Sequence, residues 1–218
     1  MRRALTSLVL LTSGACAAPH AGLPYFRTAE LTPEWLAART ANASAMHRVA
    51  PFTMTDQHGA PVSEHAFAGR VSIVHFFFTA CGDVCPVTTA NLQTFLRDLR
   101  DEHVQVLSYS VTPAHDSVAA LQAYAARRGI TDARWHLLTG SVGAVRRLAT
   151  ESYFTRLGDG STYGVASIEH TETVLLIDSE RRIRGVYAST LPIEMDRLRA
   201  DVQQLLGQPG TTSLASPK

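Results

Sequence analysis

The chain has 218 residues, a formal net charge of +1 and a sequence pI of about 7.8. This length accommodates one domain with extensions or at most two small domains, and it allows a hydrophobic core that does not depend on disulfides. Because there is no basic or acidic excess, the composition does not indicate nucleic acid or an anionic membrane surface as a partner.

The N-terminus has the layout of a secretory signal. Arg2 and Arg3 form a short positive region, an apolar stretch is centred on residues 8–11, and small residues surround Cys16. The apolar stretch is too short for a membrane-spanning helix, which needs roughly 20 apolar residues. We therefore expect residues 1–18 to be a signal peptide or lipoprotein signal. The protein would be exported, either to the periplasm or to the outer face of the inner membrane.

Two fates are open for Cys16. It is either the lipid-modified first residue of a mature lipoprotein, preceded by the small pair Gly14-Ala15, or it is removed by cleavage after the alanine-rich run. A lipid at Cys16 would bring the protein to the membrane surface. In both cases Cys81 and Cys85 remain in the mature domain. One close cysteine pair in an exported protein forms a disulfide, a redox dithiol or a metal site.

The segment that precedes the main domain contains one predicted helix, over residues 32–40. Thr32 is suited to its N-cap, and Pro33 is suited to the first helical position. The C-terminal end is rich in Gly, Pro, Ser and Thr, which predicts a mobile tail. The expected organisation is a signal over residues 1–18, a leader over 19–48, the main domain over 49–206 and the tail over 207–218.

The main domain alternates strand and helix patterns. Residues 71–78 form an almost continuous apolar run, which is typical of a fully buried central strand, and residues 86–100 have helical spacing. This order predicts an α/β fold, a central mixed β-sheet flanked by helices. The other predicted elements are a strand over 104–111, a helix over 116–128 that ends at Gly129, a strand over 135–138, a helix over 141–152, a hairpin of strands over 173–178 and 182–187, and a helix over 193–206.

Cys81 and Cys85 lie where the buried strand passes into the following helix. The start of a helix leaves unpaired backbone N–H groups, and its dipole favours negative charge. We therefore expect the pKa of the cysteines to be lowered. Asp83 is suited to cap this helix, and Pro86 is tolerated in its first turn.

The spacing of the two cysteines bears on their chemistry. Three residues separate them, whereas thioredoxin-type oxidoreductases have two. Residues four apart lie on one face of a helix, so the pair can offer two sulfurs to one ion or close a looser disulfide ring. Thiolates are soft ligands that select Cu(I) or Zn, and an imidazole would complete a trigonal site.

His170 is the candidate for that imidazole. It precedes the predicted strand over 173–178, and strand ends at one edge of an α/β sheet come together in space. Thioredoxin relatives usually have a cis-proline before the equivalent strand. No proline occurs between Pro113 and Pro192 in this chain, and a histidine takes that place.

These features resemble the Sco/SenC (PrrC) family of copper-binding assembly proteins for cytochrome c oxidase. The resemblance covers roughly residues 49–206. It rests on the cysteine motif followed by Pro86, on His-Thr-Glu at 170–172 before an apolar strand, and on the strand over 182–187. The leader sequence Leu-Pro-Tyr-Phe at 23–26 also looks like some bacterial members. The resemblance implies a thioredoxin-like fold.

The resemblance also implies that copper, as Cu(I), Cu(II) or both, is bound by Cys81, Cys85 and His170. The protein would be a metallochaperone that delivers copper to, or prepares, the copper centre of cytochrome c oxidase. Its expected partners are the copper-receiving oxidase subunit, a thiol-reducing protein and another copper chaperone, with no nucleic acid. In the alternative, Cys81 and Cys85 are a redox dithiol that reduces the oxidase subunit cysteines without carrying metal.

The other polar candidates favour structural roles. His75 lies within the buried strand, where it is expected to pack as the neutral ring or to bond a neighbour. Glu172 and Asp178 are expected to be turn and hairpin residues. His58 and His65 lie near Gly59 and are expected to be turn and surface residues. Five further histidines lack a partner at metal-ligand spacing: His20, His47, His103, His115 and His136.

Overall fold

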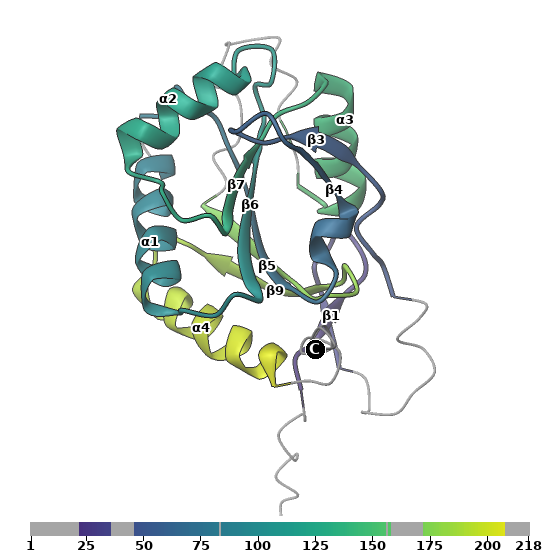
Figure 1. The fold of residues 1–218 in the computed structure, drawn as a ribbon. Coiled ribbons are helices and arrows are strands. Elements are labelled where there is room, and N and C mark those ends of the chain that lie inside the picture. The colour runs from purple at the N-terminus through teal and green to yellow at the C-terminus, as the bar shows by residue number, and fades with distance from the viewer. Residues whose placement is uncertain (1–21, 36–45, 83, 156, 158–171, 208–218) are drawn as a thin grey trace, which may run out of the picture.

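A computed structural model describes the chain over residues 22–35, 46–82, 84–155, 157 and 172–207 (Figure 1). A mixed sheet of seven strands forms its centre, in the order β2-β1-β9-β8-β5-β6-β7. Helices α1, α2 and α4 lie on one side of this sheet, and α3 with a smaller sheet of two strands lies on the other (Figure 1). The predicted α/β fold with a mixed sheet flanked by helices is confirmed.

Three parallel strands form one half of the sheet. β5 (Val71–Phe77) pairs with β6 (Val104–Ser110), which pairs with β7 (Trp135–Leu138). The connections between them contain α1 (Val84–Asp98) and α2 (Val118–Arg128). Every residue of β5 and β6 is buried, as the continuous apolar runs predict for strands that are covered on both faces.

The predicted hairpin forms the middle of the sheet. β8 (Thr173–Ile177) and β9 (Ile183–Ala188) pair with each other in antiparallel fashion, and β8 also runs antiparallel to β5. His75 of β5 lies opposite Val174 of β8, so the start of β8 is at the carboxyl end of β5. The carboxyl end of β5, which leads to the cysteines, and the start of β8, which follows His170 in the sequence, therefore lie at the same edge of the sheet.

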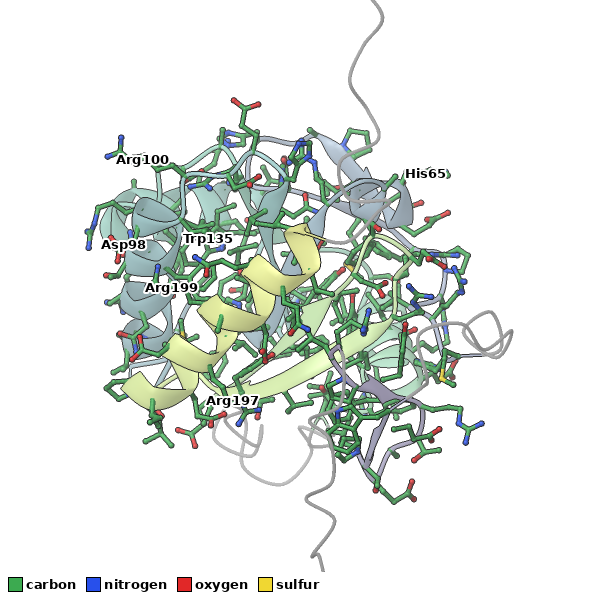
Figure 2. All side chains as sticks on the ribbon, turned by 90° about the horizontal axis from the view of Figure 1, so that it is seen from below. His65, Asp98, Arg100, Trp135, Arg197 and Arg199 are labelled. Atoms are coloured by element: carbon green, nitrogen blue, oxygen red, sulfur yellow. The ribbon has the colours of Figure 1, made fainter. Side chains whose placement is uncertain are left out.

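The last helix packs beside the first on the outside of the sheet. Figure 2 shows α4 (Pro192–Leu206) lying across the strands and next to α1. Asp98 of α1 and Arg199 of α4 face each other at this contact, with 3.5 Å between Oδ2 and Nη2. Trp135 lies in the interior beneath these helices and is 1% exposed.

The face of the sheet opposite α1, α2 and α4 is covered by one predicted helix and by a hairpin that was not predicted. α3 (Val142–Arg147) continues directly into the π-helical turn η3 (Leu148–Ser152), so the helix predicted over 141–152 is present with a wider last turn. The hairpin of β3 (Thr53–Thr55) and β4 (Pro61–Ser63), followed by the 3-10 helix η2 (Glu64–Phe67), was not predicted. Both sides of the sheet therefore have an apolar core.

The helix predicted over residues 32–40 is wrong in its first part. Pro33–Glu34 is the strand β2, and it pairs with β1 (Tyr25–Phe26), which in turn pairs with the edge of the sheet where Phe26 lies opposite Ile183. An edge strand tolerates a proline because its missing N–H is not needed by a neighbour. Residues 36–45 lie outside the described part of the chain, as do 1–21 and 208–218, so the signal and the tail remain predictions.

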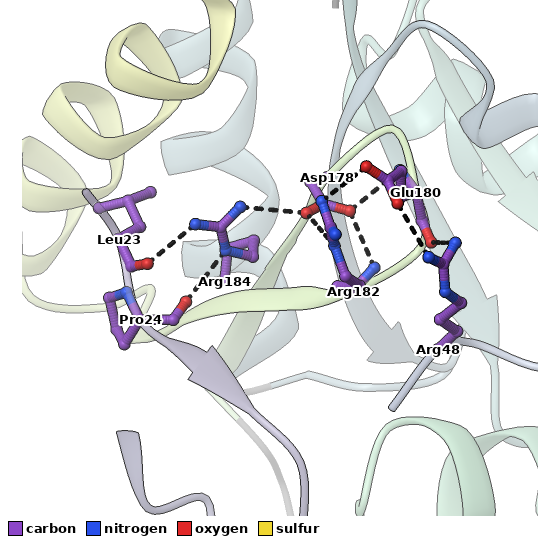
Figure 3. A network of polar contacts seen from close by, with 7 residues as sticks. All are labelled: Leu23, Pro24, Arg48, Asp178, Glu180, Arg182 and Arg184. Atoms are coloured by element: carbon purple, nitrogen blue, oxygen red, sulfur yellow. Dashed lines mark hydrogen bonds and ion pairs between the residues drawn. The ribbon is translucent and has the colours of Figure 1, made fainter. Parts of the chain in front are cut away.

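A network of arginines ties the leader to the hairpin (Figure 3). Asp178, at the β8–β9 turn, accepts a 2.8 Å bond from Arg182 Nε and a 3.1 Å bond from Arg184 Nη1. Arg184, which is 3% exposed, also donates to the carbonyls of Leu23 at 2.8 Å and Pro24 at 3.0 Å. These contacts confirm that Asp178 is a hairpin residue.

Over the described ranges, no helix has both the length and the apolar character that crossing a membrane requires.

Candidate metal centre

The two cysteines lie at the turn from β5 into α1. Cys81 N donates to Phe78 O at 3.2 Å, which forms the turn, and Cys85 N donates to Cys81 Sγ at 3.4 Å. Helix α1 begins at Val84, as expected for the strand-to-helix junction. Both thiols are free and nearly enclosed, with 3% of Cys81 and 6% of Cys85 exposed. The sequence therefore placed the pair correctly at the strand-to-helix junction, but Cys81 precedes the helix, so the turn and not a shared helical face brings the two residues together.

The acidity of Cys85 differs from the expectation. Burial, followed by the hydrogen bond and the charge of Cys81, raises the pKa of the Cys85 thiol to about 12. Backbone hydrogen bonds from Phe78 and Cys85 lower this pKa, but desolvation outweighs them, so the expected lowering is wrong for Cys85. In the metal-free protein Cys85 is thus a neutral thiol, which must lose its proton before it can bind a metal.

A buried carboxylate fixes the turn on the side of Cys81. Asp116 is 1% exposed and accepts bonds from Thr79 N at 3.2 Å and from Thr79 Oγ1 at 2.6 Å. It also accepts bonds from Ser110 Oγ at 2.6 Å and Thr112 Oγ1 at 3.0 Å. The turn that leads to Cys81 is therefore held to the end of β6. This role of Asp116 was not predicted, although the run of hydroxyl residues at the end of a predicted strand is a signal for it.

A second group of polar contacts lies on the side of Cys85. Ser189, just after β9, donates to Glu172 O from its backbone N at 2.7 Å and from its hydroxyl at 2.6 Å. Its hydroxyl also bonds that of Thr88 on α1 at 2.8 Å, and its carbonyl accepts from Asn91 Nδ2 at 2.7 Å. Glu172 further accepts a bond from the Thr190 hydroxyl. The start of β8 is thus fastened to the helix that carries Cys85.

His170 and Asp83 lie outside the described residues. Within the part of the chain that the structure describes, no group of three His, Cys, Asp or Glu side chains could hold a metal ion. The described residues therefore supply two thiols to the candidate centre. A third ligand remains the prediction made from the sequence.

His75 has the structural role expected of it. Its Nδ1 bonds Ser108 Oγ at 3.1 Å, and Trp135 Nε1 donates to the same hydroxyl oxygen at 2.8 Å. Burial lowers the pKa of His75 to about 4, so the ring is neutral near pH 7. Two other histidines make structural bonds away from the cysteines, His47 to Ser152 O at 2.8 Å and His136 to Asp56 at 3.2 Å.

The sheet, its helices and the cysteine pair at the first strand-to-helix turn define a thioredoxin-like protein with a site of two thiols. The chain belongs to the SCO1/SenC family, whose sequence profile matches residues 40–207. It is 33% identical over 160 residues to the SCO1 protein homolog of Bacillus subtilis, an alignment that covers 72% of this chain and 82% of that relative.

Two solved structures are informative neighbours. One is BsSco, a member of the Sco family of cytochrome c oxidase assembly proteins in which a disulfide switch was identified. It is 26% identical with a TM-score of 0.64, and the match covers 72% of this chain and 92% of that one. The other is Bradyrhizobium japonicum ScoI with copper bound. It is 25% identical to this chain with a TM-score of 0.61, and the match covers 73% of this chain and 99% of that one.

Proposed function

We propose that this protein is an exported copper carrier that holds one copper ion between Cys81, Cys85 and His170. The observation that carries the proposal is the pair of free, buried thiols at the turn from β5 into α1. Two thiolates are soft donors and prefer Cu(I) or zinc to hard cations. Between these metals, the copper-bound relative favours copper.

The architecture supports His170 as the third ligand. Glu172 is the last described residue before β8, and two peptide units limit the Cα of His170 to within about 7.6 Å of the Cα of Glu172. Because β8 runs antiparallel to β5, the segment before Thr173 enters the sheet at the edge where β5 leads to the cysteines. An imidazole nitrogen of His170 would complete a trigonal Cu(I) site.

The chemistry of loading and release follows from the thiols. Binding of copper requires the protons of the cysteines to leave, and oxidation of Cys81 and Cys85 to a disulfide would remove both sulfur ligands. Copper loading would therefore depend on a thiol-reducing partner. The cargo would pass by ligand exchange to the copper centre of a cytochrome c oxidase subunit, on the outer side of the inner membrane.

An anaerobic Cu(I) titration of the reduced protein tests the proposal. We expect one equivalent to bind to the wild type, and we expect Cys81→Ser, Cys85→Ser and His170→Ala to weaken binding, the cysteine variants most. His65→Ala is the matched control, because His65 is an exposed histidine with 89% of its side chain accessible. The proposal fails if the wild type takes up no copper at one equivalent, or if His65→Ala weakens binding as much as His170→Ala.

A thiol-disulfide reductase is the second candidate function, favoured by the disulfide switch of BsSco and by the contact between Cys85 N and Cys81 Sγ. In this interpretation the pair reduces the cysteines of the oxidase subunit, and His170 is not a ligand. His170→Ala separates the two functions. A carrier loses copper and its sulfur-to-Cu(II) absorption while disulfide exchange persists, whereas a reductase keeps its effect on oxidase activity in cells.

A further inference from the structure

A cavity lies between the carboxyl ends of α1 and α2 and the start of β7. Its volume of about 690 Å³ is within the range of about 300–1,000 Å³ that small-molecule sites occupy. Its lining includes the buried side chains of Leu96, Ile130 and Trp135. Arg97, which also lines it, follows Cys85 in α1 at a distance of about 18 Å along the helix axis. The cavity is therefore separate from the cysteine turn.

One arginine of the lining is fully used by the fold. Arg134 has 17% of its side chain exposed, and all five of its N–H groups have a partner. Two bond the carboxylate of Asp132, at 3.0 Å and 2.6 Å. The other three bond the carbonyls of Leu96 at 2.6 Å, Leu99 at 2.7 Å and Asp101 at 3.0 Å. Arg134 thus neutralises Asp132, the one acidic side chain among the described residues of the lining, and covers the negative end of α1.

The remaining groups that could repel an anion are also occupied or lie outside the lining. Gln93 Nε2 donates to Arg128 O at 2.8 Å, which covers a carbonyl at the end of α2. Asp101 and Glu102 come shortly after α1 but do not line the cavity, and Asp101 Oδ1 accepts a 2.8 Å bond from His103 N. The helix ends at the cavity are therefore capped by the protein itself.

Two further arginines of the lining are not used in this way. Arg100 is exposed, and its guanidinium has no partner among the described residues. Arg97 donates to the hydroxyl of Thr94 at 3.2 Å and lies 3.7 Å from Asp98, which also faces Arg199 at 3.5 Å. One carboxylate is thus shared by two arginines while Arg100 has none, so positive charge is in excess on this side of the molecule (Figure 2).

We propose that this cavity binds a small hydroxylated organic anion, whose phosphate or carboxylate group is held by Arg97 and Arg100. A planar guanidinium offers paired N–H donors that match both groups. The hydroxyls of Thr94 and Thr131 belong to the same lining and would bond hydroxyl groups of the ligand. An inorganic ion would fill only a small part of the volume, so the ligand has an organic part. The inference does not depend on the proposed function, because neither cysteine lines the cavity.

Titration of the full, metal-free chain with glucose 6-phosphate and with citrate, followed by two-dimensional NMR of the backbone amides, tests the inference. Saturable shifts should be confined to amides of the lining, such as those of Thr94, Arg97 and Thr131. Arg97→Gln and Arg100→Gln should each weaken binding about tenfold, the loss expected for a hydrogen bond to a charged group. Arg146→Gln is the matched control, because Arg146 is an exposed arginine of α3, on the other side of the sheet.

Saturable binding of either probe supports the inference, and the tighter probe identifies the anionic group as a phosphate ester or a carboxylate. The inference is refuted if neither probe shifts the amides of the lining, or if inorganic phosphate binds as tightly as the better organic probe. Equal losses in Arg146→Gln and Arg100→Gln would also refute it. Cu(I) uptake separates it from the proposed function, since Arg100→Gln should bind copper as the wild type does. A wild type without copper affinity would refute the carrier function alone.

Discussion

The buried histidine of β5 should make the stability of the protein sensitive to mild acid. His75 is 2% exposed, and within the described structure its Nε2 has no hydrogen-bond partner. Burial lowers its pKa from 6.5 to about 4. The folded state therefore favours the neutral ring, whereas the unfolded chain can take up a proton near pH 6.5. The stability that this histidine contributes is complete above pH 6.5 and is lost as the pH falls from 6.5 towards 4.

The size of the effect follows from the two pKa values. A difference of about 2.5 corresponds to about 3 kcal/mol of unfolding free energy once the pH is below both values. Between pH 7.5 and pH 4.5 most of this, about 2 to 3 kcal/mol, should be lost. This is a large share of the roughly 5–15 kcal/mol that holds a typical domain folded.

Urea unfolding of the reduced, metal-free protein at pH 7.5 and pH 4.5 measures this loss. His75→Asn removes the titrating ring and keeps a polar group towards Ser108, and His75→Leu is a second variant that cannot titrate. The wild type should lose about 2 to 3 kcal/mol more than either variant over this interval. His65→Ala, which alters an exposed histidine, should follow the wild type. If wild type and His75→Asn lose the same free energy, burial does not control the protonation of His75.

Three further predictions concern single sites. Gly185→Ala should lower the unfolding free energy by about 1–3 kcal/mol in urea, because a Cβ there would lie 2.1 Å from the hydroxyl of Tyr187, which is buried and bonded to Asp201. In the reduced metal-free protein at pH 8, iodoacetamide should alkylate Cys85 at least a hundredfold more slowly than in urea, because its raised pKa of about 12 leaves little thiolate. Asp116→Ala should destabilise the protein by about 3 kcal/mol in the same urea assay, because several buried donors lose a charged acceptor.

Elements with strong local signals were predictable from the sequence. The apolar runs that became β5 and β6 exclude a solvent-exposed face, and the strand at Trp135–Leu138 was predicted with its observed bounds. Gly129 ends α2 in the left-handed conformation with φ of 67°, which a residue without Cβ adopts without strain. The position of the cysteine pair followed from the same signals, since a buried strand and a helix on either side fix the turn between them.

Features that depend on distant partners were not predictable in this way. Pro33 is a good first residue for a helix, but pairing with the leader strand β1 at the sheet edge makes it extended. The acidity of Cys85 was misjudged because the helix start is visible in the sequence, whereas the packing that desolvates the thiol is not. The role of Asp116 needed the knowledge that the ends of β5 and β6 lie side by side.

The contacts on either side of the cysteines fit the proposed function, in which the protein holds and releases a soft metal ion. Asp116 fixes the turn before Cys81 through Thr79, and the Thr88–Ser189 bond fixes the helix after Cys85. The contacts of Asp116 and Thr88 therefore hold the turn and the helix without engaging a sulfur, whereas Cys81 Sγ accepts a bond from Cys85 N inside the turn. In the proposed function the third ligand belongs to the sequence before β8 and the thiolates to the turn after β5, so copper would leave by exchanging the histidine while both thiolates keep their geometry.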